Sequence, residues 1–177
     1  MPTTVAPGPQ PGWYRRLPPS LLRIAQRSDR VPRVPLEANA TLREAVAALA
    51  TALATDNPVE VQVVAQRVAN GVCAALGVVQ VRVVVELRRP ANARGELHGL
   101  YAPGNGQLRD LVRLWMRTAR RGQVVAFRTF LRTLLHELCH HLDYTLLHLP
   151  DSLHTLGFYR RESSLFHALG AGEVDTL

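Results

Sequence analysis

The stretch VVAFRTFLRTLLHELCHHLDYTLL, residues 124–147, is the longest helical pattern in the chain. Gly122 precedes it and Pro150 ends it. Measured around an ideal helix from His136, five leucines cluster between about 160° and 260°, and Thr145 is a mild polar interruption at the end of that face. We therefore expect one face to pack in a core while the opposite face presents histidines. The five leucines are Leu131, Leu134, Leu135, Leu138 and Leu142.

The polar face of this helix carries the motif His136-Glu137-Leu138-Cys139-His140. Residues i and i+4 lie about 40° and one turn apart on a helix, so both imidazoles can reach one metal ion. Glu137 lies at about 100°, beside the histidines, where it can reach a metal-bound water as a general base. Composition alone predicts roughly 0.01 chance occurrences of such a motif. The pattern therefore favours a metal site over a pair of surface histidines.

A third ligand is needed, because a catalytic zinc ion commonly takes three protein ligands and keeps one position open. His154 is the first choice, since it lies in the loop after the helix, where the chain can turn back. Glu162, on the last predicted helix, is the alternative ligand, and His148 is a weaker one because it still lies near the helix end. His154 is otherwise an ordinary polar loop residue.

The motif and the downstream segment His154-Thr155-Leu156-Gly157-Phe158 resemble the zincin metallopeptidases, and within them the SprT-like and WLM-type proteins. The resemblance covers roughly residues 59–165. It implies an α+β, minimal zincin-like fold, with a small mixed sheet packed on helices. Two features depart from SprT-like proteins: Thr155 stands where they often have Gly, and a Cys-rich zinc ribbon is absent. The DNA–protein crosslink role of some SprT-like proteins is therefore not carried over.

The resemblance also implies roles for individual residues. One Zn²⁺ per chain would be held by the two motif histidines and His154, and Glu137 would take a proton from the bound water during peptide hydrolysis. Residues 96–101 would match the edge strand that pairs with extended substrate by β-addition. The substrate-binding residues expected from this match are Gly99, Leu100 and Tyr101.

Further side chains near the motif have candidate supporting roles. Asp143 lies three residues after His140 on the ligand face, so it is expected either to hydrogen-bond a ligand imidazole or to be a surface carboxylate at the helix end. Cys139 points away from the ligand pair and is expected to pack in the core. The candidate donors to a developing oxyanion are Tyr101, His141, Tyr144, Tyr159 and Arg160.

The rest of the chain alternates helical and strand patterns. Thr41 and Glu44 have capping-box spacing, Pro58 suits a first helical turn, and Gly77 suits a helix end. Helices are predicted at 41–54, 58–76 and 159–169, and strands at 78–87, 96–101 and 108–116, the last of which also fits a helix.

The amino-terminal residues differ in composition from the remainder. Residues 1–35 hold eight of the twelve prolines together with six arginines. Because proline removes backbone donors and disrupts periodicity, we predict an extended Pro/Arg-rich arm over residues 1–38 and a zincin-like metallopeptidase domain over residues 39–177. The arm is expected to be either a loose tail or a cover for part of the domain or a partner.

Charge and composition restrict the classes of partner. The net charge is +7 in 177 residues, but every basic residue is Arg and the arginines are scattered, so nucleic acid is possible but not favoured. No signal-peptide pattern or membrane-length apolar run occurs, so we expect a cytoplasmic protein without a membrane partner.

The expected function is a zinc-dependent peptidase acting on peptides or proteins. A catalytically silent zinc-binding scaffold and a DNA-associated SprT-like protease are the alternatives, and the oligomeric state is left open.

Overall fold

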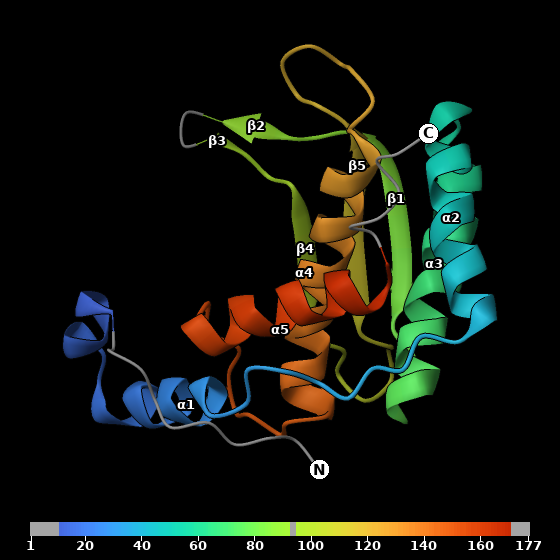
Figure 1. Ribbon diagram of the computed structural model, residues 1–177. Coiled ribbons are helices and arrows are strands. Elements are labelled where there is room, and N and C mark those ends of the chain that lie inside the picture. Colours follow the sequence, from blue (N-terminus) through green and yellow to red (C-terminus); the bar gives the residue numbers. More distant parts are fainter. Residues whose placement is uncertain (1–10, 93–94, 171–177) are drawn as a thin grey trace.

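The computed structural model describes residues 11–92 and 95–170, which form an α+β structure (Figure 1). The helices are the 3₁₀ helix η1 (Gly12–Arg16), α1 (Pro19–Asp29), α2 (Ala40–Ala54), α3 (Pro58–Leu76), α4 (Phe127–Thr145) and α5 (Leu156–Ala168). The strands are β1 (Arg82–Arg88), β2 (Ala91–Asn92), β3 (Gly95–Glu96), β4 (Gly99–Ala102) and β5 (Leu111–Arg117). The predicted α+β class is confirmed.

A three-stranded mixed sheet forms the centre, in the order β1-β5-β4. β5 runs parallel to β1 and antiparallel to β4. The outer edge of β1 is covered by α3, whose Gln66 side chain bonds to the backbone of Val81 and Val83 and whose Gln62 accepts a hydrogen bond from Val85 N–H. β4 is the opposite edge strand, and it lies beside α4.

The long helix α4 packs against the sheet, and α5 crosses α4 (Figure 1). The five leucines of the predicted apolar face are each at most 1% exposed, which confirms that face. They join one core with valines of α3, β1 and β5. Both cysteines are buried and free. In the described ranges, no helix combines the length and apolar character needed to cross a membrane.

Several predicted elements are found with shifted ends. The 41–54 helix starts at Ala40, and its cap is Asn39, which accepts from Leu42 N–H, rather than the expected box at Thr41. The 58–76 helix and its left-handed Gly77 end are confirmed. The ambiguous 108–116 segment is strand β5, while the predicted strand 96–101 is divided between the β2–β3 ribbon and β4.

The extended conformation predicted for the amino-terminal arm is wrong for residues 19–29, which form helix α1. Pro18 is the N-cap and Pro19 occupies the first turn, where the missing N–H has no partner in any helix. Residues 31–39 have no regular structure and run beside α5 towards α2 (Figure 1). Residues 1–10 lie outside the described part of the chain, and the domain boundary at residue 38 stays a prediction.

Candidate metal centre

Three histidines meet at the exposed face of α4. His136 and His140 lie one turn apart on the helix, and His154 comes back to them from the loop before α5. The Nε2 atom of His154 is 2.9 Å from Nε2 of His136 and 3.1 Å from Nε2 of His140. This group can hold a metal ion, with each residue offering one ring nitrogen.

Hydrogen bonds at the other ring nitrogens orient two of these imidazoles. Nδ1 of His136 lies 3.0 Å from the Glu162 carboxylate, and Nδ1 of His140 lies 2.7 Å from Ser152 Oγ. The Ser152 hydroxyl in turn donates to Asp143 Oδ2 at 2.7 Å. Since that hydroxyl hydrogen is used, Ser152 accepts the Nδ1–H of His140, and both rings keep the electron pair of Nε2 for the centre of the group.

Burial lowers the pKa values of two of the three imidazoles, those of His140 and His154. The pKa of His140 is lowered to about 3, first by burial and then by the neighbouring charges of His136 and His154. The pKa of His154 is lowered as well, by burial and by His136. Neutral imidazole is the form that binds metal ions, so the surroundings favour the ligating state.

The Phe158 ring packs against all three imidazole rings. Its side chain is fully buried, and its ring centroid lies 4.9, 4.7 and 5.1 Å from those of His136, His140 and His154. Thr155 caps α5 by accepting a hydrogen bond from Phe158 N–H at 3.1 Å. The segment that supplies the third histidine therefore also supplies the apolar support under the group.

The end of α1 holds this same segment in place. Asp29 accepts a hydrogen bond from Gly157 N–H at 2.7 Å, and the Ser28 hydroxyl lies 2.8 Å from that of Thr155. A Cβ added at Gly157 would come within 2.3 Å of the Ser28 carbonyl oxygen. Only glycine permits this close approach, so the end of α1 and the first turn of α5 pack tightly against each other next to His154.

Asp143 belongs to a buried cluster behind the histidines. Asp143 and Arg161 are both fully buried, with Nη2 of Arg161 2.7 Å from Asp143 Oδ1. The guanidinium also donates to the Ser28 carbonyl and hydroxyl and to the Val31 carbonyl. Asp143 thus reaches His140 through Ser152 rather than directly, and the carboxylate is held by an arginine from α5.

Glu137 lies beside the histidines, as the helix geometry predicts. It lines a pocket of about 310 Å³ that is also lined by the three histidines and by the predicted substrate-binding residues Gly99, Leu100 and Tyr101. Burial raises the pKa of Glu137 to about 7, although the charge of His136 and a hydrogen bond from the Tyr101 backbone oppose the rise. A Cβ at Gly99 would lie 2.5 Å from Glu137 Oε1, so the glycine makes room for this carboxyl.

The remaining candidates have separate places. The Tyr101 hydroxyl donates to Asp110, and the buried His141 ring lies between Asp110 and the Val79 carbonyl, so neither polar group is directed at the histidines. Tyr144 lines the pocket, and its hydroxyl is 3.4 Å from Asp151. His148 is exposed beyond the helix end and is outside the three-histidine group, and Cys139 is buried.

Two supporting residues carry no sequence signal that singles them out. Ser152 is one serine in a polar loop, and Ser28 lies in a segment that was expected to be extended. Phe158 could be found, because it ends the His-x-x-x-Phe segment. The resulting arrangement is a set of three imidazoles, each offering one ring nitrogen, beside a buried carboxyl in a pocket open to solvent. Comparisons with known protein families, with curated proteins and with solved structures found no match.

Proposed function

We propose that this protein is a zinc-dependent peptidase, with His136, His140 and His154 as metal ligands and Glu137 as the general base. The observation that carries the proposal is the convergence of three ring nitrogens beside a buried carboxyl in one pocket. A site that only stabilises the fold has no need of a carboxyl next to its ligands, since structural zinc sites are closed by four ligands.

The donor set fits a zinc ion. Nitrogen ligands about 2.0–2.1 Å from a tetrahedral zinc are about 3.4 Å apart. Two of the Nε2 separations are 2.9 and 3.1 Å, and all three ligating atoms lie within 4.8 Å of one another. Glu162 and Ser152 serve as hydrogen-bond partners of the ligand rings, which fixes the rings and raises their basicity. When bound, zinc supplies Lewis acidity, which acidifies a coordinated water and polarises the scissile carbonyl.

The chain's own residues perform the proton transfer. Glu137 accepts a proton from the attacking water and returns it to the leaving amine. The Tyr101 backbone holds the carboxyl in position, and burial keeps its proton affinity high enough for that exchange. Tyr144 lines the same pocket with a hydroxyl that has only a long contact to Asp151, so it is the donor best placed to stabilise a developing oxyanion.

Strand β4 provides a place for the substrate backbone. It is the edge of the three-stranded sheet, and Gly99, Leu100 and Tyr101 line the pocket that contains the histidines. An extended peptide added along this edge would bring a peptide bond next to Glu137, which is the arrangement expected for β-addition.

The experiment compares the wild-type chain with Glu137→Gln on a peptide library. We expect about one zinc per chain in both proteins and a cleavage rate about 10²–10⁴-fold lower in the variant, because the amide has the size of the carboxyl without its basicity. Glu44→Gln, an exposed glutamate on α2, is the matched control and should cleave like wild type.

Three outcomes would contradict the proposal. Equal cleavage by wild type and Glu137→Gln would assign the activity to a contaminant or another site. Tight zinc binding with no cleavage of any library member would favour the zinc-binding scaffold, and absence of zinc after metal-replete purification would remove the metal site itself.

A further inference from the structure

A second, larger groove runs along the outer face of α5. Its volume is about 1010 Å³, and its walls include Arg33 from the segment after α1 and Tyr159, Arg160, Ser163, Ser164 and His167 from α5. The α5 residues recur at intervals of three and four, which places them on one side of the helix. The groove therefore lies between one helix face and the chain that runs beside it.

The charge of this groove is uniformly positive or neutral. No carboxylate is among its lining residues. Arg33 and Arg160 are both exposed, and within the described ranges neither has an ion pair or side-chain hydrogen bond. The neighbouring arginine on α5 behaves differently, since Arg161 is buried and paired with Asp143. The two guanidinium groups, which have no partner among the described residues, give the groove charged donors, and the two serine hydroxyls add neutral donors, while no lining residue supplies a carboxylate.

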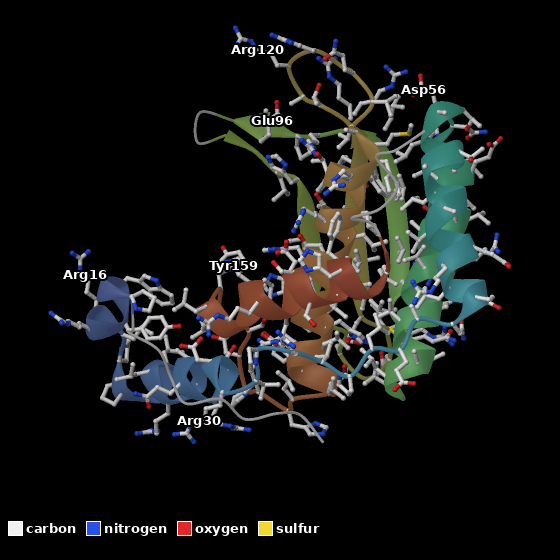
Figure 2. All side chains as sticks on the ribbon, viewed as in Figure 1. Arg16, Arg30, Asp56, Glu96, Arg120 and Tyr159 are labelled. Carbon is white, nitrogen blue, oxygen red and sulfur yellow. The ribbon has the colours of Figure 1, made fainter. Side chains whose placement is uncertain are left out.

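One end of the groove lies next to the three histidines, although none of them lines it. Tyr159, which is labelled in Figure 2, is one of its lining residues. The Tyr159 ring is stacked near the His154 ring at a centroid distance of 5.9 Å. From Tyr159 to His167 the helix rises about 12 Å at 1.5 Å per residue, which equals about four residues of extended chain. A peptide bound at the histidines could therefore continue into the groove.

We infer that this groove binds an acidic segment of the peptide substrate, next to the residues at the scissile bond. The inference rests on the proposed peptidase function and adds a substrate class to it. Carboxylates match the guanidinium donors of Arg33 and Arg160 and the hydroxyls of Ser163 and Ser164. Nucleic acid fits less well, because proteins that bind it commonly neutralise about 6–10 phosphates, and this groove has two arginines.

The test is a binding measurement on the zinc-loaded, full-length Glu137→Gln protein, which keeps the probe intact. The probes are fluorescein-labelled peptides of about a dozen residues, with a run of Glu before or after a neutral centre, and matched peptides with Gln in place of Glu. We expect an acidic peptide to bind more tightly than its Gln counterpart, and the added changes Arg33→Gln and Arg160→Gln to weaken it at least about fivefold without affecting the Gln peptide.

The matched control removes the same charge elsewhere. Arg120→Gln with Arg121→Gln changes two exposed arginines on the loop between β5 and α4, where Arg120 lies far from Tyr159 (Figure 2). Equal weakening by the two double variants would overturn the inference, because net charge alone would then explain the binding. A single-stranded oligonucleotide that binds more tightly than the acidic peptides, and depends on Arg33 and Arg160, would also overturn it.

Cleavage by the wild-type chain separates this inference from the proposed function. Cleavage with no preference for acidic peptides would agree with the proposed peptidase function but contradict the binding of acidic segments in the groove. Groove-dependent binding of acidic peptides with no cleavage would support the groove as a binding site and refute the peptidase.

Discussion

Two polar clusters lie on neighbouring turns of α4, and they differ in how their polar groups are satisfied. Around Asp143 and Arg161, both fully buried, both carboxylate oxygens and both terminal guanidinium nitrogens have partners inside the protein. Around His140, three imidazoles direct ring nitrogens at one another in a solvent-open pocket. A contribution to the stability of the fold is enough to explain the Asp143–Arg161 cluster. The second cluster can hold a metal ion, and it is where we propose that the function lies.

Breaking the buried cluster should have the largest effect. Arg161→Met leaves Asp143 as a buried carboxylate without its cation, and removing one partner of a buried pair costs about 3–5 kcal/mol of folding free energy. Urea unfolding of the zinc-free protein measures this loss. Arg160→Gln, the exposed neighbour, should change stability by less than about 0.5 kcal/mol. A loss below about 1 kcal/mol for Arg161→Met would show that the cluster is not what holds α1 to α5.

Removing a histidine from the three-histidine group should have the opposite balance of effects, with a large loss of zinc affinity and little change in folding stability. His154→Ala should lower zinc affinity by more than about 100-fold, since changing even a hydrogen-bonding partner of a ligand costs about 10–100-fold. The zinc-free stability should stay near that of wild type, because the ring is exposed and nearly all its polar contacts are to the other two histidines. Competition with a chromophoric chelator measures the affinity.

The controls for this prediction are Glu162→Ala, which should have a smaller effect, and His148→Ala, which should have none. A larger loss of affinity with Glu162→Ala than with His154→Ala would make Glu162 the third ligand. The resemblance to SprT-like proteins would then fail at its most specific residue.

The smallest expected effect concerns the residue that joins the two clusters. Ser152→Ala removes both the acceptor for His140 Nδ1–H and the donor to Asp143, so zinc affinity should fall about 10–100-fold. Ser163→Ala, on the outer face of α5, is the control. Unchanged zinc affinity in chelator competition would mean that the buried cluster does not orient the metal ligands.

The parts of the structure that local sequence predicts are those with local causes. The apolar face of α4, the Pro58 start and Gly77 end of α3, and the i, i+4 histidines all depend on residues within a few positions of one another. Composition does not predict helix α1, because the prolines that argue against regular structure in this segment also suit the start of a helix. Proline is favourable in the first turn of a helix but breaks the helix when it lies in the interior.

The return of His154 to the motif could be predicted from its place in the loop after the helix and from the resemblance, but the contacts of α1 with α5 that hold this segment could not be predicted. Arg161 bonds to Ser28 across 133 positions, and Gly157 bonds to Asp29 across 128. No periodicity or spacing links residues so far apart. The sequence therefore identifies the candidate ligands, while the structure identifies what orients them.

The contact between α1 and the start of α5 has a consequence for biosynthesis. α1 is synthesised before α5, yet the end of the loop bearing His154 is held where these two helices meet. Contacts between such distant residues form late, because a long loop must close before they form. A nascent chain that stops before α5 therefore carries α4 without the contacts that hold His154 beside it, so the proposed metal centre can form only after α5 has been synthesised.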